Sequence, residues 1–179
     1  MSKPTLVIVS GFAGSGKTTL AHALARAIGC PAICRDEIKE GMVHAHGPFE
    51  AGWCDELTQR TFPLFFEVLG LLLRAGVTTG GEAAFQHFNW EPNLAPFSDI
   101  ADIRIIRCRT DPATARARVE SRGHRTAHAD GPLLAGLDAG DLYYENFDHI
   151  RIDAPTMDVD TTSGYDPALD EIVGFVNRA

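Results

Sequence analysis

The chain has 179 residues, of which 45% are hydrophobic, and its 24 acidic and 16 basic side chains give a formal net charge of −8. This length suits one domain over residues 1–179, and the acidic balance disfavours a nucleic-acid partner, since phosphate contacts need a basic surface. We find neither a long apolar segment nor a charged-then-apolar N-terminal leader, so we expect a cytoplasmic protein with no membrane partner. The four cysteines show neither a C-x-x-C pair nor zinc-ligand spacing, which disfavours disulfides and a metal cluster.

The N-terminal segment has the pattern of a strand, a loop and a helix. Residues 5–10 form a β-branched apolar run typical of a buried parallel strand, and residues 19–28 carry leucines and isoleucine at helical spacing. Between them, residues 11–18 fit the pattern G-x-x-x-x-G-K-[ST], whose backbone N–H groups cradle nucleotide phosphates. We expect Lys17 to bind the outer phosphates and the Thr18 hydroxyl to ligate magnesium. The candidate nucleotide-binding residues are Gly11, Ala13, Gly14, Ser15, Gly16, Lys17, Thr18 and Thr19.

A carboxylate follows the second predicted strand, residues 31–34. Asp36 should lie at the carboxyl edge of a parallel sheet, which is where open sheets bind their ligands. We therefore expect Asp36 to face the phosphate loop and to act as general base toward a substrate hydroxyl. The alternative is that Asp36 only caps a helix. Residues 37–76 are predicted to be mainly helical, with an interruption near residues 47–48.

The third strand is expected within residues 76–85, although residues 79–81, Thr-Gly-Gly, are unusually small for a strand buried on both faces. Either a helix packs closely there or the strand is strained or short. Glu82, at the end of this strand, would lie near the phosphates, where it is expected to hold magnesium through water or to bind a phosphate acceptor. A solvent-facing glutamate is the alternative. Residues 86–90 are expected to form a polar-aromatic recognition loop, and residues 92–101 a helix.

Regular elements are also predicted in the C-terminal half. Residues 103–108 predict the fourth strand, and Asp111-Pro112 opens a helix with a capping residue and a first-turn proline. Residues 132–142 are expected to form a returning helix, although two glycines weaken it. Residues 156–161 alternate like a final strand, and residues 167–178 have the spacing of a terminal helix.

Four arginines, at positions 116, 118, 122 and 125, lie within ten positions of this acidic chain. Such clustering suits a lid over about residues 119–135, because guanidinium groups bind phosphoryl oxygens and neutralise transferred charge. Arg122 and Arg125 are the leading candidates for that role. The alternative is a solvated basic helix face, which we favour most for Arg118.

These motifs together resemble the small P-loop kinases, a group that includes nucleoside monophosphate kinases, gluconate kinase, adenylylsulfate kinase, chloramphenicol phosphotransferase and zeta-toxin-like enzymes. The motifs are the phosphate loop, Asp36, Asp111-Pro112, Arg116 and Arg122-Gly123-His124-Arg125. The resemblance covers nearly the whole chain and implies an α/β, three-layer P-loop NTP hydrolase fold. In that fold a five-stranded parallel sheet of order 2-3-1-4-5 carries helices on both faces and an arginine-bearing lid. It also implies ATP and Mg²⁺ as cofactors, Arg116 among the nucleotide-binding residues, and Thr18 and Glu82 at the metal.

Two features depart from the family pattern. The third strand is less apolar than usual and carries Glu82 where an aspartate is more common. Residues 37–53 match no acceptor signature, and the regular arginine set of nucleoside monophosphate kinases is absent. The phosphate donor is therefore better defined than the acceptor.

The sequence predicts an ATP-dependent P-loop kinase that transfers the γ-phosphate to a hydroxyl of a small molecule such as a sugar, a nucleoside or an antibiotic. The expected catalytic residues are Lys17, Asp36, Arg122 and Arg125. One alternative is a nucleotide-dependent switch or accessory ATPase that acts on a protein or RNA partner. A nucleotide kinase with a phosphorylated acceptor is the third possibility.

Overall fold

The computed structural model describes residues 3–123 and 125–178. Its centre is a five-stranded sheet in the order β2-β3-β1-β4-β5, and each neighbouring pair is parallel. The order 2-3-1-4-5 is therefore confirmed. The strands are β1 (Thr5–Ser10), β2 (Ala32–Cys34), β3 (Thr79–Ala83), β4 (Asp102–Arg109) and β5 (Thr156–Asp160).

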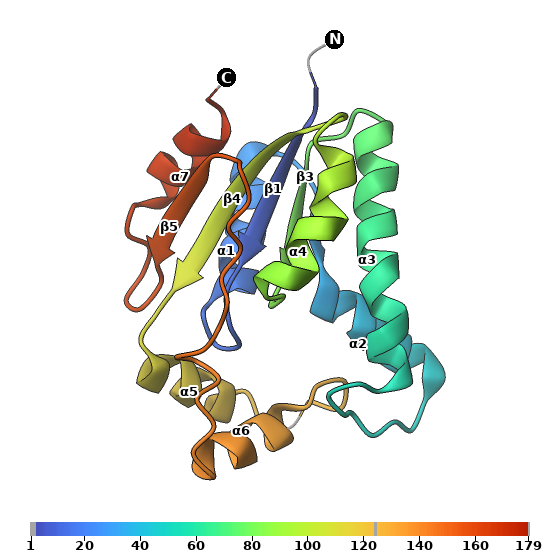
Figure 1. The fold of residues 1–179 in the computed structure, drawn as a ribbon, viewed down its shortest axis with the longest axis vertical. Helices are drawn as coiled ribbons and strands as arrows, with labels where there is room; N and C mark the ends of the chain where they lie inside the picture. The colour runs from blue at the N-terminus through green and yellow to red at the C-terminus, as the bar shows by residue number, and fades with distance from the viewer. Residues whose placement is uncertain (1–2, 124, 179) are drawn as a thin grey trace.

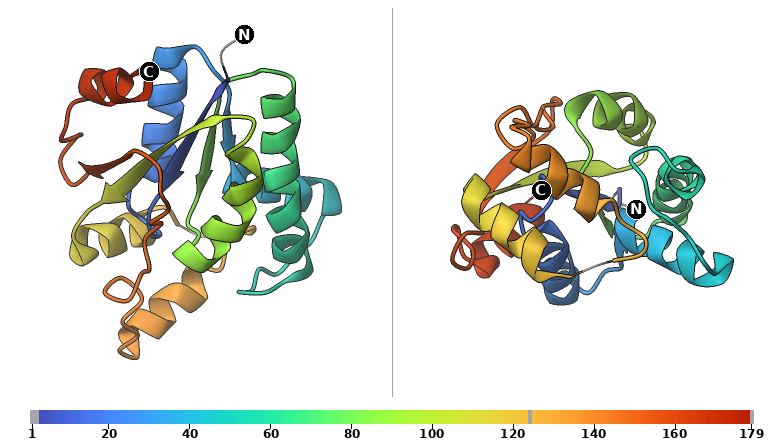
Figure 2. Two further views of the ribbon diagram at one scale, coloured as in Figure 1. Left: turned by 45° about the horizontal axis from the view of Figure 1, so that its top comes forward. Right: turned by 90° about the horizontal axis from the view of Figure 1, so that it is seen from below.

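Helices cover both faces of the sheet, which gives three layers (Figure 1). The helices are α1 (Lys17–Ile28), α2 (Arg35–His46), α3 (Glu56–Arg74), α4 (His87–Leu94), the short 3-10 helix η1 (Ala95–Phe97), α5 (Pro112–Ser121), α6 (Asp130–Asp138) and α7 (Leu169–Val176). Helices α5 and α6 lie beyond the carboxyl ends of the strands, as Figure 1 and the left view of Figure 2 show. No described helix is long and apolar enough to cross a membrane.

The alternation of side chains along β1 divides the core into two halves. Leu6 and Ile8 pack with α3, α4 and Ile105 on one face, whereas Val7 and Val9 pack with α1 and α7 on the other. Because the central strand is apolar on both faces, it is held in the middle of the sheet. This placement fixes the loop after β1 at the centre of the carboxyl edge.

The small residues of β3 have a packing explanation. All five residues of the strand are buried, and a Cβ atom added to Gly81 would lie 2.9 Å from Cδ1 of Leu69 in α3. The first of our two interpretations, a closely packed helix, is therefore correct. The glycine lets α3 approach the sheet without overlap.

The loop expected over residues 86–90 was wrong, although Gln86 and Asn89 line a cavity described below. Residues 87–94 form α4, and residues 95–97 form η1, so the helix expected at 92–101 begins earlier and ends earlier. Trp90 is fully buried, and its indole N–H donates to Ser10 Oγ at 3.0 Å. This tryptophan is a core residue that fixes α4 to the end of β1, because its apolar ring fills the core while its N–H is satisfied.

Candidate active site

The phosphate loop connects β1 to α1 in the geometry that its glycines predict. Gly14 and Gly16 have φ angles of 84° and 76°, in the left-handed region that favours glycine, and α1 begins at Lys17. A Cβ atom at Gly14 would lie only 2.2 Å from the carbonyl oxygen of Ala115, so α5 packs directly on the loop. The backbone N–H groups at the start of α1 thus form a cradle for phosphate.

Contacts from distant segments hold this loop in place. Thr161, just after β5, donates its hydroxyl to the Ser15 carbonyl at 2.6 Å. Arg118 donates to the Gly14 carbonyl at 3.2 Å and to the Thr161 carbonyl at 2.7 Å. The Ala13 N–H donates to the Tyr143 hydroxyl oxygen at 3.2 Å.

The structure reverses the expected ranking of two arginines on α5. Arg118, which we favoured as a solvated residue, contacts the phosphate loop. Arg116, expected among the nucleotide-binding residues, instead pairs with Glu120 at 2.8 Å and with Asp138 of α6. Arg116 lines neither of the two cavities described below. It links α5 to α6.

Lys17 and Glu82 form a buried pair at the end of the loop. Lys17 Nζ lies 3.6 Å from Glu82 Oε1, and Thr18 Oγ1 donates to Glu82 Oε2 at 3.0 Å. Burial alone would lower the pKa of Lys17, but the charges of Glu82 and Asp36 outweigh burial and raise it. The lysine is therefore held as a cation beside the phosphate cradle.

The position of Glu82 excludes one of its expected alternatives. Its side chain is only 1% exposed and lines neither cavity, so it is not a solvent-facing residue. Glu82 Oε1 has no hydrogen-bond partner among the described residues. Oxygen donors from a hydroxyl and a carboxylate suit Mg²⁺, which binds few protein ligands and keeps several waters. Thr18 and Glu82 thus fit the group that the sequence predicts.

Asp36 lies in the first turn of α2 and does not cap the helix. The N-cap position is Cys34, so the capping alternative for Asp36 is excluded. Arg35 donates to Asp36 Oδ1 at 3.0 Å, and His128 Nδ1 lies 3.7 Å from Asp36 Oδ2. Burial opposes ionisation, but Lys17, His128 and Arg35 together lower the pKa of Asp36 to about 2.

Two cavities meet at these residues. The smaller, of about 210 Å³, lies over the phosphate loop and is lined by Gly16, Lys17, Thr18, Thr19, Asp36, Glu37, Glu40, Arg122 and Arg125. The larger, of about 470 Å³, extends between α2, α4 and the α5–α6 connection. Lys17, Asp36, Arg122 and Arg125 line both. The four residues expected to be catalytic therefore converge on one space.

The α5–α6 connection supplies the two arginines and a histidine. Arg125 donates twice to the Asp130 carboxylate, at 2.7 and 2.9 Å, which fixes its guanidinium plane. His128 Nε2 lies 2.7 Å from Glu40 Oε1, so this connection is joined to α2. His124, part of the arginine motif, lies outside the described residues.

Several site residues were not identified from the sequence. Tyr143, His128, Arg35 and Lys39 all line the larger cavity, yet none belongs to a motif. Their positions depend on how α2 and the segments around α6 pack against the sheet edge. Arg35, adjacent to Asp36, is the only one of these four with a local sequence signal.

Fold and site together define an α/β protein of the P-loop class, with a phosphate cradle at the carboxyl edge of a parallel sheet. The family model described as "AAA domain" matches residues 6–141, and the chain belongs to this family. A comparison with curated proteins found no match.

Solved structures share the whole architecture. A provisionally named kinase from Chloroflexus aurantiacus j-10-fl has a TM-score of 0.83 at 24% identity, over 98% of this chain and 97% of its own. A sugar kinase from Janibacter sp. HTCC2649 has a TM-score of 0.66 at 17% identity, over 98% and 96%. The APS kinase of Mycobacterium tuberculosis, in complex with AMPPNP and APS, has a TM-score of 0.67 at 16% identity, over 99% and 100%. The fold is that of small P-loop kinases.

Proposed function

We propose that this protein is an ATP-dependent phosphotransferase that moves the γ-phosphate of ATP to a hydroxyl group of a small molecule. The observation that carries the proposal is the shared lining of the two cavities by Lys17, Asp36, Arg122 and Arg125. A phosphoryl donor over the loop and an acceptor in the larger cavity would meet at these residues. Such juxtaposition is the main requirement of phosphoryl transfer, which depends on positioning and charge stabilisation.

Each residue has a role in this scheme. Lys17 binds the outer phosphates, and Thr18 with Glu82 would hold Mg²⁺, which neutralises phosphate charge when bound. The acceptor oxygen forms a bond to the γ-phosphorus as the bond from phosphorus to the ADP oxygen breaks. Asp36 accepts the hydroxyl proton and then releases it to solvent. Arg122 and Arg125 stabilise the charge on the transferred group.

The charges in the larger cavity favour a neutral acceptor over a phosphorylated one. Outside the phosphate side, its Arg35 and Lys39 are each paired with a carboxylate, from Asp36 at 3.0 Å and from Asp55 at 2.6 Å, and its His128 Nε2 lies 2.7 Å from Glu40 Oε1. Paired cations bind an additional anion less strongly than free ones. This arrangement gives less support to a nucleotide kinase.

Two exposed aromatic side chains suit an acceptor with a flat apolar face. Trp53 and Phe88 line the larger cavity although they are 60% and 64% exposed. Gln86 and Asn89, which flank Phe88 at the start of α4, offer amide groups to hydroxyls. Sugar rings, nucleosides and many antibiotics combine these two features, and pockets of this kind bind them by apolar contact plus a few polar groups.

The test is incubation with ATP, Mg²⁺ and a panel of hydroxyl-bearing metabolites and antibiotics, followed by product mass. We expect one class to gain a phosphoryl group. Release of phosphate to water alone would contradict the proposal and favour a switch or accessory ATPase that acts on a protein or RNA partner.

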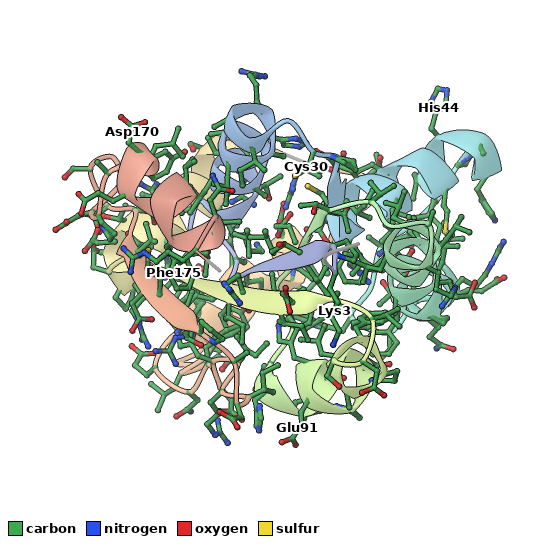
Figure 3. The ribbon with its side chains drawn as sticks, turned by 90° about the horizontal axis from the view of Figure 1, so that it is seen from above. Lys3, Cys30, His44, Glu91, Asp170 and Phe175 are labelled. Atoms are coloured by element: carbon green, nitrogen blue, oxygen red, sulfur yellow. The ribbon has the colours of Figure 1, made fainter. Side chains whose placement is uncertain are left out.

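With the acceptor in hand, Asp36→Asn is expected to lower kcat about a hundredfold, the low end of general-base effects, because a carboxylate whose pKa is about 2 is a weak base. Nucleotide affinity, measured with a fluorescent ATP analogue, should be retained. Asp170→Asn, at an exposed aspartate on α7 (Figure 3), is the matched control. An unchanged kcat in Asp36→Asn would exclude Asp36 as the base.

A further inference from the structure

Three potential metal ligands meet beside the phosphate loop, although the sequence spacing gave no indication of them. They are His22 of α1, Cys34 at the end of β2 and Glu37 of α2, and their ligand atoms all lie within 4.8 Å of one another. His22 Nε2 lies 2.6 Å from Glu37 Oε1 and 3.6 Å from Cys34 Sγ. The proposed chemistry of phosphoryl transfer uses none of the three.

The geometry is close to that of a zinc site. With usual bond lengths, a tetrahedral zinc ion holds a sulfur and a nitrogen ligand about 3.5 Å apart, and a nitrogen and an oxygen ligand about 3.3 Å apart. The distance from Cys34 Sγ to His22 Nε2, 3.6 Å, is already close to this value. The distance from His22 Nε2 to Glu37 Oε1 must increase from 2.6 Å by roughly 0.7 Å, which is within reach of two side chains that are each nearly half exposed.

We propose that His22, Cys34 and Glu37 form a binding site for a thiophilic divalent cation such as Zn²⁺. Three protein ligands leave a fourth position for water or a ligand, as in open zinc sites. The sulfur and imidazole donors select zinc over magnesium, which prefers oxygen ligands. The site is thus separate in chemistry from the Thr18 and Glu82 pair.

The surroundings favour a cation. Cys34 is 2% exposed, so its sulfur is directed by the fold and is not a mobile surface thiol. Its register partner on β3 is Glu82, whose buried carboxylate adds negative charge near the sulfur.

The position of the site connects it to the nucleotide. Glu37 lines the smaller cavity over the phosphate loop, together with Lys17 and Thr18. His22 follows Thr18 by one helical turn on α1. A cation held here would border the phosphates, so its binding is expected to change nucleotide affinity.

The test uses the full chain with Co²⁺ as a spectroscopic substitute for Zn²⁺. All measurements are made in a Cys54→Ser background, because Cys54 is an exposed thiol that could bind metal by itself. We expect one equivalent of Co²⁺ to bind, with a thiolate-to-cobalt absorption band. Zn²⁺ should displace it, and a large excess of Mg²⁺ should not.

Two variants and two matched controls decide the assignment. His22→Gln and Cys34→Ser should each weaken Co²⁺ binding about a hundredfold or more, and Cys34→Ser should also remove the band. Cys30→Ser and His44→Gln are the controls. His44 points away from the body of the molecule (Figure 3), and Cys30 follows the end of α1, which is Ile28. Both controls should bind like the parent.

The proposal is overturned if Co²⁺ does not bind, if it binds without a thiolate band, or if His22→Gln binds as tightly as the parent. His22→Gln carries the test even if Cys34→Ser fails to fold, because its side chain is 45% exposed. If the proposal is overturned, His22 and Glu37 are a surface ion pair beside the buried thiol of Cys34.

Discussion

The buried pair of Lys39 and Asp55 makes a strong prediction about stability. Lys39 Nζ lies 2.6 Å from Asp55 Oδ2, and the two side chains are 3% and 10% exposed. The same carboxylate caps α3 by accepting from the Thr58 N–H at 2.7 Å, and it accepts from the Gly52 N–H at 3.1 Å. Asp55 therefore joins α2, α3 and the segment between them, which form one wall of the larger cavity.

The cost of Asp55→Ala has two parts. Loss of the helix cap costs about 1 kcal/mol. A buried ammonium left without its partner costs about 3–5 kcal/mol more. The sum, about 4–6 kcal/mol, is a large fraction of the stability of a typical domain. In a Lys39→Met background the second part disappears, so the same substitution should cost only about 1 kcal/mol.

Urea unfolding of the four proteins in this double-mutant cycle measures the coupling. We expect the double variant, which carries both Asp55→Ala and Lys39→Met, to be more stable than Asp55→Ala alone. Thermal unfolding should show this difference as a higher Tm, even if the single variant is only partly folded. An equal loss of unfolding free energy in both backgrounds would refute the reasoning. It would mean that the Lys39 ammonium reaches water when Asp55 is absent.

Two further predictions concern pH and packing. The pKa of Asp55 is lowered from 3.8 to about 2, because its hydrogen bonds from Lys39, Thr58 and Gly52 outweigh burial. Its stabilising effect, roughly 2 kcal/mol, should be complete above about pH 4 and lost as pH falls toward 2, so Asp55→Asn should unfold with a shallower acid dependence. Gly81→Ala would bring a Cβ to 2.9 Å from Leu69 and should cost about 1–3 kcal/mol by urea unfolding. Gly174→Ala, in open space on α7, should instead gain about 0.5–1 kcal/mol; an equal effect of both alanines would contradict the packing argument.

Several parts of the site could be predicted because their signals are local. The phosphate loop needs left-handed backbone at Gly14 and Gly16, and that need is written in the sequence itself. Asp36 lies two residues after a short strand, and the carboxyl ends of parallel strands meet at one edge. Its position near Lys17 could therefore be inferred without knowing how the helices pack.

Other assignments failed because a local pattern does not show which side chain faces the site and which faces the core or solvent. Arg116 and Arg118 are two positions apart on one helix, so they point in different directions, and only the contact of α5 with the loop decides which one reaches it. Trp90 looked like a recognition residue among polar neighbours. The approach of α4 to β1 buried it.

The sequence alone determined the succession of strands and helices along the chain, the phosphate cradle and the carboxylate beside it, since each depends on backbone preferences and on hydrophobic periodicity over a few residues. The order of the strands in the sheet was implied by the family resemblance. Only the tertiary structure decided the shape of the larger cavity, the pairing of its cations, and the meeting of His22, Cys34 and Glu37. These features join side chains from different elements. Their distances are set by packing across the sheet edge, which no local pattern encodes.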